Sequence, residues 1–458
     1  VGYTAGWYAT GSNNTFLGSA AGKGGNSSAP FSSGQNNVAV GYRALTAFTT
    51  GDYNTALGSN AGLSLTSGQY NNFIGYLAGD SLISGSNNTA IGGSALQASI
   101  GSSNNVAIGP SAGYNITTGN SNVLIGYKAG YAQKTQSSVI AIGYEAMGGT
   151  AGTNEGYDIA IGYRAMFAAM DGANGTALGN SALQYYIGNY SVAVGGEAGR
   201  YASGSNNTFL GYSAGKGGTT SAPYSSGTNN TAIGYQALLS HTDGADKNTV
   251  VGRRAGYGIT TGDYNVLLGN DAGFGITTGG NNVVIGHQAM DASSGAADGM
   301  VAIGVEALST FNGGNVDSSV AVGEYSLNSL TDGVSSVAVG TKALRYTTGD
   351  RNTAVGSDAA YNMTTGDDNV AVGYLALGIA GAASDNTAVG NKAGRLAVKT
   401  QFGTFLGMQA GEYATGSYNT FVGGQAGQGG TTSAPYSSGQ YNVALGYQAL
   451  TAFTTGYN

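Results

Sequence analysis

Hydrophobic and polar residues recur along this chain in a short phrase that returns at an almost constant spacing. The phrase is a polar residue, three apolar residues, a glycine, two variable residues and an alanine, as in N-V-A-V-G-Y-R-A at 37–44. Twenty-six glycines carry it, from Gly2 to Gly446, and between Gly41 and Gly143 their spacing is always 17. A unit this short cannot enclose a core of its own. The sequence therefore predicts a stack of coils in which each coil packs on its neighbours.

Each apolar trio predicts a short β-strand, because runs such as 38–40 are too short for a helix and rich in β-forming residues. Side chains alternate along a strand, so Val38 and Val40 share one face while Ala39 lies on the other. Both faces are apolar, which indicates burial on both sides. We expect the Ala/Phe column, to which Ala39 and Phe73 belong, to be packed between chains. A monomeric solenoid with a flattened second face is the alternative.

We number each coil from its glycine, so that the strand occupies positions −3 to −1. Position −4 is Asn in 17 of the 25 coils that contain it. Stacked identical amides predict a hydrogen-bonded side-chain ladder, with Asn37, Asn88, Asn265 and Asn442 among its members. The fold class expected is all-β: a parallel β-roll or β-solenoid of about 26 short coils, mostly of 17 residues. No composition shift marks a boundary, so residues 1–458 are expected to form one continuous roll.

Three coils are longer than the rest, with 23 residues from one glycine to the next. Their extra residues contain Pro and Gly and cannot continue a strand, so protruding loops are expected at 19–40, 212–233 and 424–445. Pro30, Pro223 and Pro435 lie in these inserts and are candidate contacts for a partner. The segment 1–17 resembles the segment 406–422, which indicates that the chain is a window of a longer fibre.

Composition narrows the functional classes. Charged residues make up 9% and the net charge is −7, which argues against a nucleic-acid partner. No apolar run is long enough to span a membrane, and the absence of cysteine excludes disulfides and thiolate chemistry. The two histidines, His241 and His287, are isolated in the sequence, with no clustered carboxylates. We therefore expect no metal site, no cofactor and no enzymatic activity.

Tyrosine is the residue type whose placement in the repeat suggests contacts with a binding partner. Ten of the 31 tyrosines directly follow the repeat glycine, and stacked rings at this position could contact glycans or surfaces, since tyrosine combines an apolar body with a polar tip. The alternative is a structural aromatic ladder along the coil edge. The candidate contact residues are Tyr42, Tyr76, Tyr127, Tyr144, Tyr163, Tyr235 and Tyr447.

The repeat phrase, seen as N-V-A-I-G-P-S-A at 105–112, resembles the head repeats of trimeric autotransporter adhesins (YadA-like heads). Similar repeats occur in bacteriophage tail-fibre proteins. This resemblance implies a left-handed roll, a homotrimer and a role in attachment to glycans or cell-surface receptors. The coils here are somewhat longer than in the adhesin heads, and no neck, stalk, membrane anchor or self-cleaving chaperone domain is recognised in the sequence.

Three functions remain open at this stage. The first is a structural and adhesive fibre outside the cell or on its surface. The second is the shaft of a phage tail fibre that carries a receptor-binding tip, which would place the protein in a virion. The third is an ice- or polysaccharide-binding solenoid that uses rows of Thr and Asn, although the T-T-G segments lie at turns and are missing from many coils.

Overall fold

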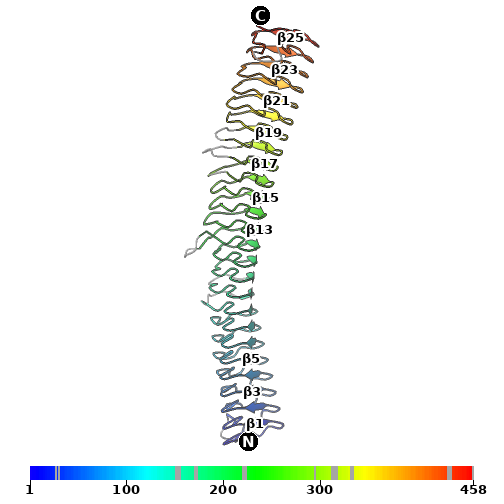
Figure 1. The fold of residues 1–458 in the computed structure, drawn as a ribbon. Helices are drawn as coiled ribbons and strands as arrows, with labels where there is room; N and C mark the ends of the chain where they lie inside the picture. The colour runs from blue at the N-terminus through cyan, green and yellow to red at the C-terminus, as the bar shows by residue number, and fades with distance from the viewer. Residues whose placement is uncertain are drawn as a thin grey trace. The chain divides into compact units, whose positions relative to one another are not determined.

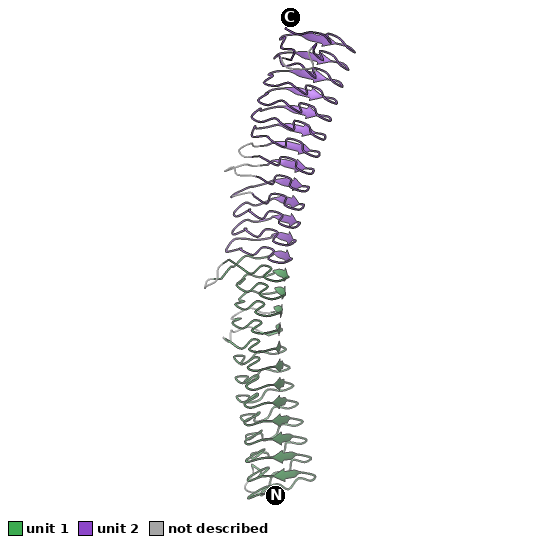
Figure 2. Cartoon of the chain, in the orientation of Figure 1, with its two compact units in different colours: residues 1–229 green, residues 230–458 purple. Residues whose placement is uncertain are grey.

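The computed structural model describes residues 1–25, 28, 31–149, 156–169, 174–218, 224–292, 295–310, 318–330, 335–430 and 436–455. The chain divides into two compact units, Val1–Asn229 and Asn230–Asn458 (Figure 2). In both units the described regular structure consists of three-residue strands joined by turns, and each strand pairs in parallel with the strands of the coils before and after it in its unit (Figure 1). The expected all-β solenoid with a mostly 17-residue repeat is therefore confirmed.

The first unit contains twelve strands in its described residues. They are β1 (Thr15–Leu17), β2 (Val38–Val40), β3 (Thr55–Leu57), β4 (Asn72–Ile74), β5 (Thr89–Ile91), β6 (Val106–Ile108), β7 (Val123–Ile125), β8 (Ile140–Ile142), β9 (Ile159–Ile161), β10 (Thr176–Leu178), β11 (Val192–Val194) and β12 (Thr208–Leu210).

The second unit contains thirteen strands in its described residues. They are β13 (Thr231–Ile233), β14 (Thr249–Val251), β15 (Val266–Leu268), β16 (Val283–Ile285), β17 (Val301–Ile303), β18 (Val320–Val322), β19 (Val337–Val339), β20 (Thr353–Val355), β21 (Val370–Val372), β22 (Thr387–Val389), β23 (Thr404–Leu406), β24 (Thr420–Val422) and β25 (Val443–Leu445).

Strand register is the same at every described pairing, whatever the coil length. Strands β2 and β3, which are joined by a coil of the common length, align Ala39 with Ala56. Strands β1 and β2, which are joined by one of the three long coils, align Phe16 with Ala39. Parallel neighbours require a crossover of about a dozen residues or more, and the remainder of each coil provides it. Equivalent positions consequently form columns along each unit.

The core of each unit lies inside the coils and contains the middle residue of the strand. Ala39 and Phe73 are fully buried within this single chain, as are Ala44, Leu45 and Phe48 of the same coil as Ala39. The expectation that the Ala/Phe column packs between chains is therefore wrong. A 17-residue coil encloses a thin interior, which admits alanine at the strand centre, whereas the larger Val38 and Val40 lie on the outer face.

Large residues at the strand centre occur beside glycines at position +4. Phe73 lies between Gly62 and Gly79, where added Cβ atoms would stand 2.7 and 2.6 Å from its ring carbons. Where the strand centre is alanine, as at Ala90, position +4 can hold a buried leucine such as Leu96. The core thus keeps its volume by pairing one large side chain with small neighbours.

The glycine that follows each strand makes the close approach between coils possible. Gly58 has a φ of +141°, and a Cβ there would stand 2.5 Å from the carbonyl oxygen of Gly75 in the next coil. A side chain at this position would both strain the backbone and separate the coils. The glycine column therefore does more than allow the bend that its sequence pattern predicts.

Candidate interaction surfaces

In each unit the outer face of the strands is a column of aliphatic and threonine side chains, which we call the aliphatic stripe. It consists of the first and third residue of every strand, and these positions hold only Val, Ile, Leu, Thr and one Asn. Many of them are exposed: Leu17, Val38, Leu57, Ile74, Ile108, Leu178, Val192 and Leu210 in the first unit, and Ile285, Val339, Val355, Val370, Val389, Val443 and Leu445 in the second. Monomeric proteins rarely expose apolar patches this extended, and such patches typically mark interaction sites.

The tyrosines that follow the repeat glycine lie at the surface. Tyr42, Tyr76, Tyr127, Tyr144, Tyr163, Tyr235 and Tyr447 are between 41% and 72% exposed. Tyr144 stacks on Tyr127 and on Tyr163, with ring centroids 5.2 and 5.3 Å apart. In such a stack the ring faces cover one another, which leaves edges and hydroxyl groups for a partner. The ring of Tyr447 instead lies beside Gly424 of the preceding coil, where a Cβ would meet it at 3.3 Å.

Pro30, Pro223 and Pro435 lie outside the described residues. Immediately after each of them stands an aromatic ring that is described. Phe31, Tyr224 and Tyr436 stack on Tyr8, Tyr201 and Tyr413 at centroid distances of 6.2, 6.2 and 6.3 Å. The three long coils thus share an aromatic pair, which the recurring Pro-Phe/Tyr dipeptide could have indicated.

The asparagines at position −4 form a buried ladder. Asn54 donates its backbone N–H and its side-chain amide to Oδ1 of Asn37, at 2.8 and 3.1 Å, and donates the other amide hydrogen to the carbonyl of Gly68 at 2.8 Å. Asn88 and Asn265 make the same set of bonds to their own neighbours. Asn442 donates twice to Oδ1 of Asn419.

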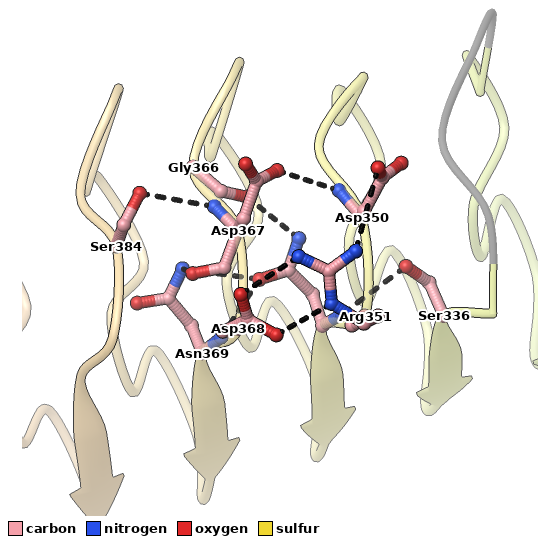
Figure 3. A network of polar contacts seen from close by, with 9 residues as sticks. Ser336, Asp350, Arg351, Gly366, Asp367, Asp368, Asn369 and Ser384 are labelled. Atoms are coloured by element: carbon pink, nitrogen blue, oxygen red, sulfur yellow. Dashed lines mark hydrogen bonds and ion pairs between the residues drawn. The ribbon is translucent and has the colours of Figure 1, made fainter.

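A second ladder, which the sequence reasoning missed, lies two residues before the first, at position −6. There a Ser, Asp or Asn side chain accepts a hydrogen bond from the backbone N–H of the preceding coil. The Asp350 N–H donates to Oδ1 of Asp367 at 2.8 Å, and the Asp367 N–H donates to the Ser384 hydroxyl at 3.1 Å (Figure 3). Asp52, Ser103 and Asp263 play the same part elsewhere. The recurring G-D-Y-N and G-S-N-N segments carry this signal.

Ion pairs also follow the coil-to-coil direction. Arg351 donates two hydrogen bonds to the carboxylate of Asp368, at 2.7 and 2.8 Å (Figure 3), and Arg254 pairs with Asp271 in the same manner. Arg351 and Asp368 are both exposed, so their pair contributes little to stability. In the other pair Arg254 is half-buried and Asp271 is largely buried. The positions of the aliphatic stripe itself carry no charge.

Two buried ionisable groups interrupt the apolar and amide columns. Asp158 occupies the Asn column and accepts a hydrogen bond from the Gly175 N–H at 2.7 Å, and burial raises its pKa to about 6. His241 occupies a core position equivalent to Phe48 and Leu65, and burial lowers its pKa to about 4. His287, by contrast, is exposed.

Within the described ranges, no three His, Cys, Asp or Glu side chains cluster so that they could hold a metal ion. No helix that is both long and apolar enough to traverse a lipid bilayer occurs among the described residues. No protein-family model matches the sequence, and comparison with curated proteins finds no significant match.

Proposed function

We propose that this chain is the shaft of an extracellular attachment fibre, on a cell surface or on a virion, in which three copies pack together through the aliphatic stripe. The supporting observation is the stripe itself, because it presents uncharged apolar side chains at every coil. The resemblance of the repeat phrase to trimeric adhesin heads and to tail fibres supports the same assembly. In this proposal the chain has no enzymatic role.

Association of chains would gain free energy from many similar side chains along the aliphatic stripe. Leu57 is 47% exposed, so covering it would contribute about 1 kcal/mol, half of the roughly 2 kcal/mol that complete burial of such a side chain contributes. Each strand offers one or two such aliphatic positions. Several consecutive coils would therefore offset the entropic cost of association, which is on the order of 10 kcal/mol.

An ice-binding role receives less support from the threonines. The Thr66 and Thr117 hydroxyls donate to the Ile83 and Lys134 carbonyls of the following coils, at 2.9 and 3.1 Å, and Thr260 does the same to Thr277. These donor hydrogens are used within the coil stack, so they are not free to order water on a flat face.

The test of assembly is the molar mass in solution, measured by light scattering after size exclusion. The wild-type chain is expected at three times its own mass. A variant with three charges on the stripe, Val40→Asp, Leu57→Asp and Ile74→Asp, is expected as a single folded chain. A matched variant of the same coils, Thr50→Asp, Ser67→Asp and Ser84→Asp, changes exposed turn residues and should remain trimeric.

A wild-type chain that stays monomeric at all concentrations would overturn the assembly. So would a stripe variant that associates like the control. Attachment is tested separately, by binding of the labelled protein to cells and to immobilised glycans. Replacing Tyr42 and Tyr76 by serine should weaken that binding if the exposed tyrosines contact the receptor, and should leave the molar mass unchanged.

A further inference from the structure

Two pairs of tyrosines on neighbouring coils lie face to face at the surface. Tyr53 stacks on Tyr70 with ring centroids 5.0 Å apart and planes inclined by 2°, and Tyr418 stacks on Tyr441 at 4.8 Å and 3°. All four residues occupy position −5, and between 43% and 53% of each is exposed. Each pair is therefore both in contact and open to a reagent in solution.

The backbone holds these rings in place. Tyr53 and Tyr70 both have a φ of +57°, and their N–H groups donate to the carbonyls of Gln35 and Asp52 in the preceding coils, at 3.0 and 3.1 Å. In the second pair, the Tyr418 and Tyr441 N–H groups donate in the same way, at 2.9 and 3.4 Å. Because strand register fixes which coils are neighbours, each tyrosine has one defined partner. Groups held together in this way react as if each were at a very high local concentration.

We propose that these pairs are sites of oxidative cross-linking, at which a dityrosine bond staples one coil to the next. A one-electron oxidant removes one electron and one proton from each phenol, which gives two adjacent tyrosyl radicals. A carbon–carbon bond then forms between the ring carbons ortho to the two oxygens, and the two ring hydrogens move to the oxygens as the rings regain aromaticity. With a haem peroxidase as oxidant, two phenols and one hydrogen peroxide give one dityrosine and two waters.

The chain contains an internal comparison for this chemistry. Phe402 stacks on the other face of Tyr418, with centroids 5.3 Å apart and planes inclined by 16°, and it is also exposed. A phenylalanine ring has no phenolic O–H from which a tyrosyl-type radical could form, so the Phe402–Tyr418 contact should not cross-link. Tyr144 has two tyrosine neighbours, Tyr127 and Tyr163, and one staple is expected in that trio.

The staple would join tyrosines of adjacent coils in the same polypeptide, so it is an intrachain bond. It would close a loop of one coil and oppose separation of that coil from its neighbour. This inference does not depend on the proposed trimer or on attachment, since both partners belong to the same chain.

The experiment exposes the full-length protein to a haem peroxidase and hydrogen peroxide, as an equal mixture of normal and isotope-labelled chains. Peptides are then analysed by mass spectrometry, in which a dityrosine link is two hydrogen atoms lighter than the sum of its two peptides. Links between 53 and 70 and between 418 and 441 are expected at least about tenfold more often than links that involve Tyr42 or Tyr76. They should join peptides of one isotope only.

Three variants sharpen the test. Tyr70→Phe should abolish the link at Tyr53 while it preserves the ring stack and the far-ultraviolet circular dichroism spectrum. Phe402→Tyr should create a new link between 402 and 418. Tyr76→Phe, at an exposed tyrosine outside these pairs, should change neither link.

The inference would be overturned if these pairs were unreactive in the folded protein, or if the urea-unfolded chain gave the same distribution of links. Mixed-isotope links at these positions would also contradict it, since they would show coupling between chains.

Discussion

The buried asparagine ladder allows a prediction at Asn71 whose size follows from its contacts. Asn71 is fully buried. Its amide donates to Oδ1 of Asn54 at 3.0 Å and to the Gly85 carbonyl at 2.9 Å. Its own Oδ1 accepts the Asn88 N–H and the Asn88 side-chain amide, both at 3.0 Å. Replacement by alanine removes all four bonds but does not leave all four partners unsatisfied.

Two groups would lose the partner that the ladder gives them. Oδ1 of Asn54 still receives the backbone N–H of residue 71, at 3.0 Å, and the Asn88 amide still reaches the Ser102 carbonyl at 2.8 Å. The Asn88 N–H and the Gly85 carbonyl are left buried without these bonds. Each such group costs about 1–3 kcal/mol, so Asn71→Ala should destabilise its part of the stack by about 4 kcal/mol.

Serine provides the matched control, because it occupies this column naturally. The Ser336 hydroxyl accepts the Asn352 N–H at 3.2 Å. In an Asn71→Ser variant the serine hydroxyl would accept the Asn88 N–H in the same way, so only the Gly85 carbonyl would lose its hydrogen bond. Its expected cost is about 2 kcal/mol, half that of alanine. The assay is native-state hydrogen exchange, which resolves local opening: the Asn88 amide should exchange fastest in the alanine variant. Equal exchange in the two variants, within about 0.5 kcal/mol, would refute the accounting by individual hydrogen bonds.

Three further predictions concern the core and its ionisable residues. Gly79→Leu should strongly destabilise the fold when made alone. Combined with Phe73→Ala it should be largely compensated, because the leucine would then fill the space of the phenylalanine ring. If denaturant unfolding showed the two effects to be additive, the two side chains would not share one volume in the core. The pKa of Asp158 is raised to about 6 in the fold, so its contribution to stability is complete below about pH 4 and disappears as the pH rises through 6. The wild-type protein should therefore lose about 3 kcal/mol of its free energy of unfolding over that interval, and Asp158→Asn should not. Melting temperatures measured against pH check this difference. The pKa of His241 is lowered to about 4, so its contribution is complete above about pH 6.5 and is lost as the pH falls to 4; His241→Leu should abolish that acid sensitivity, and an unchanged profile would exclude His241 as its origin.

Much of the fold could be predicted from the sequence because the repeat carries it. The spacing of the glycines gives the coil length, and the β-forming trio gives the strand. The pattern does not show which of the two strand faces points into the coil and which points outward. Both columns are apolar, so alternation alone cannot decide which one lines the coil. The inner face holds a small residue such as Ala39 where the neighbouring positions are large, and it holds Phe73 where Gly62 and Gly79 leave room for the ring.

The second ladder was missed for a different reason. Position −6 holds Ser, Asp, Asn or Gln in most coils, and these are residues that any turn would favour. Their role appears only when coils are stacked, since the bonding partner of Asp367 is the Asp350 N–H of another coil. The burial of His241 could have been predicted, because its place in the coil is that of Phe48 and Leu65.

Coil length varies from 16 to 23 residues, yet strand register does not change. Some positions of a coil are therefore fixed by the stacking, while others are free to differ in number and type. Strands β10 and β11 align Ala177 with Ala193 across one of the shortest coils, just as β1 and β2 align across one of the longest. In shorter coils the fixed positions run from the ladder at −6, through strand and glycine, to the residue at +7, which is buried at Phe48 and Tyr186. In the three long coils, position +7 is instead an exposed glycine, at Gly25, Gly218 and Gly430. Additional residues therefore fall between about +7 and the next −6, where they alter neither hydrogen-bonded column. Because a coil gains residues there without loss of packing, we expect differences in what such a protein binds to lie in these segments and in the outward side chains, while the strand phrase is constrained by its neighbours on both sides.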